Sequence, residues 1–556
     1  QTDRLPEEQR RGITIELGFA PWRIDDDLLI SVIDAPGHRK LVHHMIAGAS
    51  GIDVVMLVVA ADEGVMPQTR EHIAACRLLG VQRAVIAITK ADRADEELAE
   101  MAAEEAKDLL QEQGITSSAV VCSAKTGQGI DALRKAVLAA VAKSLQTPRR
   151  VLRTRLSVDR VFSVKGAGTV VTGTLVEGAI NVGETLRVIG PNRELSASAR
   201  GLHVHGDSCE RAQAPTRLAI NLAGVAVKDV ARGDILTTDP CVRPTRILDV
   251  WLTPEHPLRR GSEATIFVGT ARSVAKIQPI GGIHLLDTDG LVRLRLHTPL
   301  VVFGGDRFVL RGALVDGPTG AVVGGGVIVD APPPANLRAS KRVALLMALH
   351  HNAAAEAITL LAAEQQPRPV TAQAMASRFS IDVETLSAAA DTLLDGGPLM
   401  AMAEGWVSRG AVDTLAQRAL KTVAQHHRAE PLDPGLRRQT LREQLTTQAG
   451  ANVAAMVVQR LLDAGALVMA DNCVRLASFK GADANPQARQ ALANASQRLT
   501  AAALQGITEG GMNEALGVPP KQVRAVLAAL VRSGQAIHVA NIWFDAVAVK
   551  ELQSQL

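Results

Sequence analysis

The chain has 556 residues, enough for about three to five domains of ordinary size. Hydrophobic residues make up 47% of it and charged residues 21%, so a globally disordered chain is excluded. The formal net charge of +3 excludes a wholly basic nucleic-acid binder, although it does not exclude local basic surfaces.

The five cysteines are scattered along the chain and form no C-x-x-C pair. This pattern predicts neither a disulfide framework nor a thiolate zinc site, and we expect a reducing, cytoplasmic location. The longest apolar run, at residues 54–61, is too short to cross a bilayer, and no export signal opens the chain, so we expect no membrane partner. Because the first residue is Gln1 rather than Met, we also expect that the natural beginning is missing.

Residues 1–147 alternate apolar, β-branched runs with stretches rich in Ala, Leu and Glu. We expect buried strands at residues 28–34, 53–61, 84–89 and 119–122, and helices at residues 69–79, 95–113 and 129–144. Strands that alternate with helices predict an α/β domain with a parallel, doubly wound sheet.

Residues 150–333 are rich in Val, Thr and Gly and show period-two alternation. This pattern is typical of all-β structure, and the length suits two small β-barrels, at residues 150–242 and 243–333. Pro332-Pro333-Pro334 then predicts a stiff linker.

The rest of the chain is rich in Ala, Leu and Gln and contains a weak repeat. A helix is followed by a glycine turn and two short strands, with the turn glycines at Gly397, Gly465 and Gly534. This recurring order of elements predicts three tandem, mainly helical winged-helix modules, at residues 337–409, 410–479 and 485–556. An irregular helical bundle is the alternative.

Two motifs carry groups suited to a metal and a phosphate. After the first expected strand, residues 34–38 read Asp-Ala-Pro-Gly-His. The Asp34 carboxylate can hold Mg²⁺ through water, and the backbone N–H of Gly37 can approach a phosphate. Upstream, Thr14 offers a hydroxyl to the same ion.

Two further motifs predict a guanine site. Thr89-Lys90-Ala91-Asp92 follows the third expected strand, and the Asp92 carboxylate can accept two hydrogen bonds from adjacent N–H groups of guanine, a pair that adenine lacks. Ser123-Ala124-Lys125 ends the fourth strand, where backbone N–H groups can meet the guanine O6 atom. Each motif alone arises often by chance, but four in this order, three of them at strand ends, argue against chance.

Together the motifs resemble those of the elongation factor Tu superfamily of translational GTPases. The resemblance implies that Thr14, Asp34 and Gly37 bind Mg²⁺ and sense the γ-phosphate, and that His38 orients the attacking water. It assigns base reading to Lys90, Asp92 and residues 123–125. The usual Asn of the family is Thr89 here.

The same family needs the phosphate loop G-x-x-x-x-G-K-[ST], and this chain contains no Gly-Lys dipeptide. Because the first residues already resemble the first switch segment, we infer that the loop lies upstream of Gln1. A degenerate, non-hydrolysing GTPase is the alternative, which the intact His38 and Thr14 disfavour.

A finer resemblance points to the selenocysteine-specific elongation factors. Similar stretches lie at residues 3–19, 159–168, 231–234 and 307–311, and the match extends with weaker identity to the end of the chain. Bacterial members carry four winged-helix modules and grip a messenger RNA hairpin with the last. Because we count three, we expect that the last module is also missing.

An aminoacyl pocket for selenocysteine has a simple electrostatic requirement. A selenol is more acidic than a thiol, so selenocysteine is mostly an anion at neutral pH, whereas serine is neutral. Two guanidinium groups favour the anion and stay unsatisfied beside a hydroxyl. The resemblance carries this pocket onto Phe19, Asp159, Arg160 and Arg232, with both arginines facing the selenolate. Without the family, Asp159 and Arg160 would be an ordinary surface ion pair.

The sequence therefore predicts a monomeric GTPase, dependent on GTP and Mg²⁺, that carries selenocysteinyl-tRNA to the ribosome at recoded UGA codons. Its C-terminal modules would contact the selenocysteine insertion hairpin of the messenger RNA. We expect the third module to act as a spacer, because its candidate recognition helix presents only Lys521 and Arg524 outward. The alternatives are another tRNA-carrying translational GTPase and a non-hydrolysing scaffold with nucleic-acid-binding winged helices.

Overall fold

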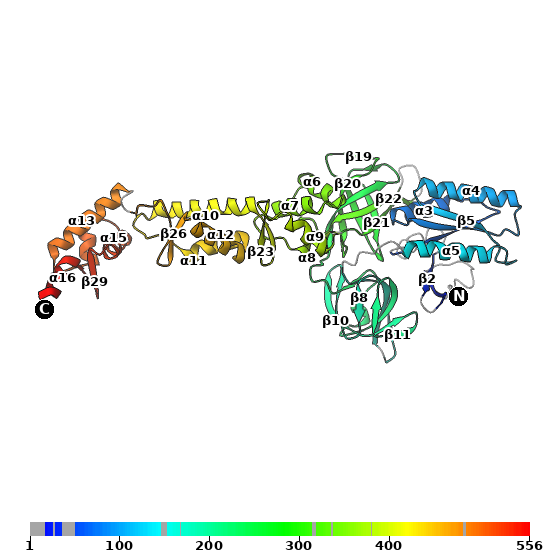
Figure 1. Cartoon of the computed structure of the whole chain (residues 1–556), viewed down its shortest axis with the longest axis horizontal. Helices are drawn as coiled ribbons and strands as arrows, with labels where there is room; N and C mark the ends of the chain where they lie inside the picture. The colour runs from blue at the N-terminus through cyan, green and yellow to red at the C-terminus, as the bar shows by residue number, and fades with distance from the viewer. Residues whose placement is uncertain are drawn as a thin grey trace. The chain divides into compact units, whose positions relative to one another are not determined.

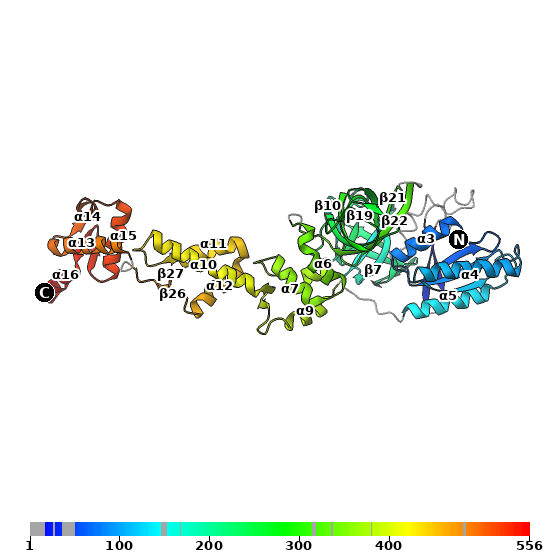
Figure 2. The ribbon, with the colours of Figure 1, turned by 90° about the horizontal axis from the view of Figure 1, so that it is seen from above.

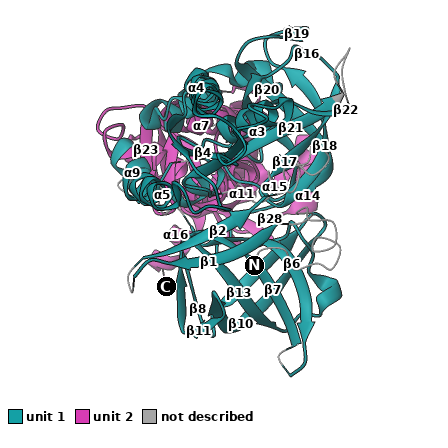
Figure 3. Cartoon of the chain, turned by 90° about the vertical axis from the view of Figure 1, so that its right-hand side faces the viewer, with its two compact units in different colours: residues 1–358, 372–389 teal, residues 359–371, 390–556 magenta. Residues whose placement is uncertain are grey.

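The computed structural model describes residues 17–25, 28–35, 51–145, 153–166, 168–313, 319–334, 337–379, 381–481 and 485–555. The chain divides into two compact units, coloured separately in Figure 3. Unit 1 contains residues 1–358 and 372–389, and unit 2 contains residues 359–371 and 390–556.

The first domain of unit 1 is built on a parallel sheet of order β3-β4-β5. Its elements are β3 (Val55–Ala60), α3 (Pro67–Leu78), β4 (Arg83–Thr89), α4 (Glu96–Glu112), β5 (Thr116–Val121) and α5 (Ile130–Leu145). Ala84, Ile86 and Ile88 pack under α3 and α4, while the alternate residues Val85 and Ala87 are buried on the face that α5 covers (Figure 1). Helices on both faces confirm the predicted α/β architecture.

The strand expected at residues 28–34 does not join this parallel sheet within the described residues. It forms β2 (Leu29–Asp34), which pairs antiparallel with β1 (Gly18–Arg23), a strand that we did not predict. Ser31 and Val32 are exposed, so the prediction of a buried parallel strand is wrong.

The second domain is a β-barrel. Its elements are β6 (Arg155–Val164), β7 (Gly168–Glu177), β8 (Ala179–Asn181), β9 (Thr185–Gly190), β10 (Arg193–Val204), β11 (Asp207–Cys209), β12 (Arg211–Gln213), β13 (Thr216–Ala223), the 3₁₀ turn η2 (Val227–Asp229) and β14 (Ile235–Thr237). The main sheet runs β11-β10-β13-β7-β6-β14-β9, and a further pairing of β9 with β10 closes it. Inward residues such as Leu156, Leu218 and Ile220 alternate with polar outward ones, as a small barrel requires.

The third domain is a closed barrel of order β15-β20-β18-β17-β21-β22. Its strands are β15 (Thr245–Pro254), β16 (Leu258–Arg259), β17 (Glu263–Val268), β18 (Ala271–Pro279), β19 (Leu285–Leu286), β20 (Gly290–Leu300), β21 (Arg307–Ala313) and β22 (Thr319–Asp330). Helix α3 of the first domain packs Ala75 and Leu78 against Phe267, Val309 and Val322 on this barrel. The apolar contact fixes the first domain on the third within unit 1.

A buried ion network joins the third domain to the helical segment that follows it in unit 1. Arg342, at the end of the 3₁₀ turn η3 (Ala339–Arg342), donates to Asp249 and Asp330 at 2.6 Å each. Arg293 on β20 also pairs with Asp249, and Arg378 of α8 (Ala372–Arg378) pairs with Asp330. Both aspartates are 0% exposed, so every charge must have a partner. The other helices of this segment of the chain are α6 (Val343–His350), α7 (Ala354–Glu364) and α9 (Val383–Asp391), and the boundary between the units falls within α7 and near the end of α9.

The described residues of unit 2 form three β-hairpins, each at the predicted position after a helix and a glycine turn. They are β23 (Leu399–Met402) with β24 (Gly405–Ser408), β26 (Leu467–Ala470) with β27 (Cys473–Leu476), and β29 (Ala536–Val539) with β30 (Ile542–Asp545). Short strands β25 (Leu436–Arg437) and β28 (Ile507–Thr508) complete the second and third sheets. The predicted repeat is thereby confirmed as winged-helix structure.

The helices of unit 2 pack in bundles against these hairpins. They are α10 (Arg409–Ala429), α11 (Arg438–Ala449), α12 (Ala451–Asp463), α13 (Pro486–Ala502), α14 (Glu509–Leu516), α15 (Pro520–Arg532) and α16 (Ala546–Gln555). Helices α10, α11 and α12 lie side by side (Figure 2) and bury Val412, Leu441 and Val457 between them. No helix among the described residues is both long and apolar enough to span a membrane.

Candidate functional site

The two base-reading motifs meet at the ends of β4 and β5. The Ser123 hydroxyl donates to Asp92 Oδ1 at 2.6 Å, and Lys125 Nζ lies 3.9 Å from Asp92 Oδ2. The Ser123 hydrogen bond is the main cause that lowers the pKa of Asp92, with smaller contributions from Lys125 and Arg93. Asp92 is therefore an ionised acceptor at neutral pH, which is the form that paired N–H donors of guanine require.

Backbone geometry holds this loop in shape. Ser123 is 0% exposed, and its N–H donates to the Gln128 carbonyl at 2.9 Å. Gly129 has a φ of +71°, and a Cβ there would lie 2.1 Å from the Val121 carbonyl oxygen. Only glycine fits this position, which turns the chain from β5 into α5.

Thr89 and Lys90, which belong to the same motif as Asp92, contact other parts of the domain. The Thr89 hydroxyl donates across the sheet to the Val59 carbonyl at 3.3 Å. Lys90 has a φ of +59°, and its ammonium pairs with Glu63 at 2.7 Å and Asp62 at 3.6 Å. Thus Asp92 and residues 123–125 come together, while Thr89 and Lys90 support the neighbouring strand and turn.

Of the residues predicted to bind phosphate, metal or the attacking water, Asp34 is among those that the structure describes. Asp34 ends strand β2 and is half-buried. Thr14, Gly37 and His38 lie outside the described residues.

A β-bulge in the second domain puts two consecutive charged residues on the same face. The pairing of β6 with β7 shifts between Val158 and Arg160. Val158 and Val161 both belong to the barrel core, so Asp159 and Arg160 between them both face outward. A bulge of this kind re-aims a side chain that strict alternation would bury.

Asp159 and a second arginine form a compact cluster across three adjacent strands. Arg217 on β13 donates to both carboxylate oxygens of Asp159, and the Thr172 hydroxyl on β7 donates to Asp159 Oδ1 at 2.7 Å. The Arg217 and Asp159 side chains are 17% and 12% exposed. Asp159 therefore pairs with Arg217 rather than with Arg160, in contrast to the surface pair that the sequence alone allowed.

Strand β1 of the first domain covers this cluster. The Arg217 guanidinium lies over the Phe19 ring, 3.5 Å from its centroid, and Arg160 Nη2 donates to the Leu17 carbonyl at 3.3 Å. A further contact joins Ser31 on β2 to His205 after β10, at 3.2 Å. Phe19, Asp159 and Arg160, all predicted for the aminoacyl pocket, are thus brought together with Arg217.

Arg232 does not join this group. It lies in the exposed turn before β14, and none of the hydrogen bonds or ion pairs between described residues involves its side chain. Arg217, which sequence reasoning missed, is the second arginine of the cluster. The only local signal was an arginine at an outward position of an alternating strand, and its approach to Asp159 depends on the register of β13 with β7.

Four protein-family models match the chain. They are "Elongation factor Tu GTP binding domain" at residues 1–143, "Elongation factor Tu domain 2" at residues 168–237, "Selenocysteine-specific elongation factor, beta-barrel domain" at residues 245–335 and "Elongation factor SelB, winged helix" at residues 420–476. They follow one another in the order of the domains described above.

The relatives extend this match to nearly the whole chain. The selenocysteine-specific elongation factor of Desulfomicrobium baculatum is 32% identical over 98% of this chain and 86% of its own length. The chain belongs to the selenocysteine-specific elongation factors. The Escherichia coli protein of the same name is 40% identical over 56% of this chain, and the matched part is 49% of that protein.

Solved structures show the same fold. A bacterial selenocysteine-specific elongation factor superposes on 100% of this chain and 87% of its own, with a TM-score of 0.75 at 23% identity. The factor from Methanococcus maripaludis, in complex with a GTP analogue, covers 57% of this chain and 73% of its own, with a TM-score of 0.52 and 27% identity.

Proposed function

We propose that this chain is a GTP-dependent elongation factor that delivers selenocysteinyl-tRNA to the ribosome at recoded UGA codons. GTP hydrolysis releases the cargo, and the C-terminal region contacts the selenocysteine insertion hairpin of the messenger RNA. Membership of the family and the order of the domains support this reading. A monomeric state and a cytoplasmic location remain predictions.

The observation that carries the cargo assignment is the charge of the cluster beneath β1. Arg160 and Arg217 bring two guanidinium groups to the cluster, and Asp159 binds that of Arg217. A selenolate offers these groups a negative charge to bind, whereas the neutral hydroxyl of serine offers none. Asp159 and Thr172 fix the orientation of Arg217, so we assign Arg160 and Arg217 to the selenolate.

The side-chain oxygens at the predicted nucleotide site suit guanine and Mg²⁺. The ionised Asp92, held by Ser123, fits the paired N–H donors of guanine. Thr14 and Asp34 offer a hydroxyl and a carboxylate, which are the hard oxygen ligands that Mg²⁺ prefers, Asp34 acting through water. When bound, GTP and Mg²⁺ supply the charge that orders the switch segment. We assign Gly37 to the γ-phosphate and His38 to the orientation of water.

Strand β1 gives a route from the nucleotide to the cargo. It follows the segment that contains Thr14; Leu17, the residue just before β1, supplies its carbonyl to Arg160, and Phe19 of β1 supplies its ring to Arg217. A switch segment that rearranges on hydrolysis would move these two groups and change the environment of both guanidinium groups. Cargo release then follows from the loss of their arrangement.

A hydrolysis-protection assay tests the cargo. The full-length protein with GTP is incubated with selenocysteinyl-tRNA or seryl-tRNA, and the rate of ester hydrolysis is measured for each. We expect strong protection of the selenocysteinyl ester and little protection of the seryl ester. Equal protection of both would favour a general tRNA carrier, and protection of neither would favour a scaffold.

A further inference from the structure

The helix expected to read nucleic acid in the third winged-helix module is already engaged by protein. Helix α15 is the second helix of the α14–α15 pair, the position of a recognition helix. Its basic residues are Lys521, Arg524 and Arg532. Lys521 pairs with Glu430, Arg524 Nε lies 2.6 Å from a Glu509 oxygen, and Arg532 donates to the Leu432 carbonyl at 2.5 Å. A phosphate at α15 would have to compete with these contacts, although the Lys521 and Arg524 side chains are 82% and 70% exposed and such surface pairs are individually weak.

Helix α13 of the same module has the opposite character. Its 17 residues include Arg489 and Arg498 but no aspartate or glutamate. Within the part of the chain that the structure describes, neither arginine forms an ion pair or a side-chain hydrogen bond. The exposed side of α13 is thus positively charged with no carboxylate of its own to neutralise it.

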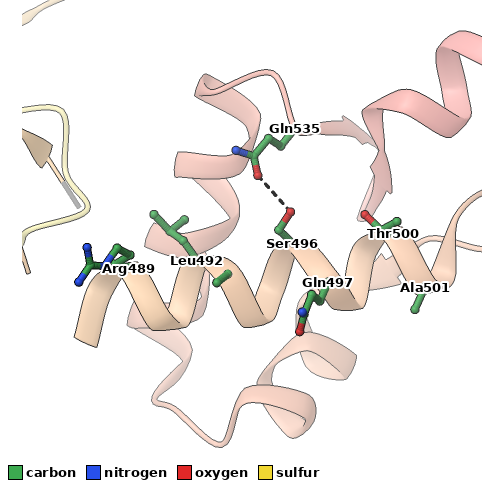
Figure 4. A pocket seen from close by; sticks show the side chains of 8 residues that line it. Arg489, Leu492, Ser496, Gln497, Thr500, Ala501 and Gln535 are labelled. Carbon is green, nitrogen blue, oxygen red and sulfur yellow. Dashed lines mark hydrogen bonds between the residues drawn. The ribbon is translucent and has the colours of Figure 1, made fainter. Parts of the chain in front are cut away.

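A shallow groove of about 690 Å³ runs along one side of α13 (Figure 4). Its lining residues are Arg489, Leu492, Ala493, Ser496, Gln497, Thr500, Ala501 and Gln535. Ser496 Oγ donates to Gln535 Oε1 at 3.1 Å, which leaves the amide N–H₂ of Gln535 available to a ligand. The amide of Gln497 and the guanidinium of Arg489 supply further donors.

The carboxylate beside this groove is satisfied by protein groups. Asp545 is 8% exposed and accepts hydrogen bonds from the Thr500 hydroxyl and from the N–H groups of Val547 and Ala548. These bonds, led by that from Ala548, lower the pKa of Asp545. Asp545 therefore stays ionised at neutral pH and is held at the start of α16, so the Arg489 end of the groove suits an anion better than the Thr500 end.

We propose that this groove, with Arg489 at one end, binds the sugar-phosphate backbone of a double-helical RNA stem, and that α15 does not. Guanidinium and amide donors match phosphate and ribose oxygens. None of the described residues that line the groove is aromatic. They therefore offer no stacking platform for unpaired bases, and a paired stem fits better than a single strand. The assignment rests on the proposed function, which brings a messenger RNA hairpin to this region, and it replaces the expected spacer role.

The test uses the whole chain and a fluorescein-labelled RNA duplex of arbitrary sequence, with binding followed by anisotropy at several salt concentrations. Arg489→Glu is compared with Arg498→Glu, which changes the net charge equally but lies outside the groove. We expect Arg489→Glu to weaken duplex binding about tenfold and to lower the salt slope by about one. Arg498→Glu should change affinity less than about twofold.

Three results would overturn the proposal. Equal losses of duplex affinity in Arg489→Glu and Arg498→Glu would show that only the overall charge matters. A larger loss of affinity in Lys521→Gln or Arg524→Gln would show that α15 contacts the RNA. Tighter binding of a single strand than of the duplex would contradict the choice of ligand. The tRNA protection assay is independent of this groove, so a negative result here with normal protection would leave the proposed function standing.

Discussion

At the scale of single residues, the sequence predicted those parts of the site that depend on local motifs. Asp92 and Ser123 each follow a strand of one parallel sheet, and parallel strands bring their ends to one edge, so their 2.6 Å contact was predictable. Arg217 was not, because it lies 58 residues from Asp159 and reaches it only through the pairing of three strands. The break in alternation at Asp159-Arg160 marks the bulge that turns Asp159 outward, but it does not indicate which strand supplies its partner.

Gly129 gives a prediction at this scale. Gly129→Ala should destabilise the first domain by about 2 kcal/mol or more, because the new Cβ would collide with the Val121 carbonyl in a left-handed conformation. Gly127 is the matched control: its φ is +81°, but its Cβ would meet nothing within 4 Å, so Gly127→Ala should cost only about 1 kcal/mol. Urea unfolding of both variants gives the two values, and equal losses would show that the carbonyl contact is unimportant.

At the scale of elements, repeats were more predictable than isolated strands. The three hairpins of unit 2 were predicted because a helix, a glycine turn and two strands recur with nearly constant spacing. The apolar run at β2 was placed in the wrong sheet, since a short apolar run does not specify its partner. Its actual partner β1 carries Phe19 and lies against the second domain.

The contact between β2 and the second domain should depend on pH. Burial, followed by the charges of Arg217 and Arg23, lowers the pKa of His205 below its ordinary value of 6.5. The neutral imidazole is therefore favoured in the folded state, so its contribution is complete above 6.5 and is lost as the pH falls through the lowered pKa. Hydrogen exchange of the β1–β2 amides, corrected for intrinsic rates, should show weaker protection near pH 5 than near pH 7.5.

His205→Asn is the control for this titration. His205 has a φ of +53°, which Asn tolerates, and the Asn amide does not titrate. This variant should show no difference in protection between the two pH values. A difference as large as in the unaltered protein would assign the effect to other groups.

The buried ion network of unit 1 gives a prediction about the attachment of the helical segment to the third domain. Arg342→Met leaves Asp249 and Asp330, both 0% exposed, short of one cation, so we expect a loss of about 3–5 kcal/mol of unfolding free energy. Arg70→Met removes a pair whose side chains are 56% and 48% exposed and should cost less than about 1 kcal/mol. Chemical unfolding of both variants measures the difference, and similar losses would contradict the assigned role of burial.

At the scale of the whole molecule, composition and periodicity predicted the sequence of an α/β domain, two barrels and winged helices. The division into two units was not predicted, because the unit boundary falls within the first winged-helix module. Part of this module belongs to unit 1 because Arg342 pairs with Asp249 of the third domain. The two residues are far apart in sequence, and both are buried, which no local sequence pattern indicates. The proposed cargo site depends on the same kind of long-range contact, between β1 and the cluster of Asp159, Arg160 and Arg217.

The most direct test of the account is the cargo preference of a variant that carries both Arg160→Gln and Arg217→Gln. Protection of selenocysteinyl-tRNA and of seryl-tRNA is measured for this variant, for the unaltered protein and for Arg232→Gln, all in the presence of GTP. If the two guanidinium groups recognise an ionised side chain, the double variant should lose its preference for the selenocysteinyl ester, while Arg232→Gln retains it. An unchanged preference in the double variant would contradict the account.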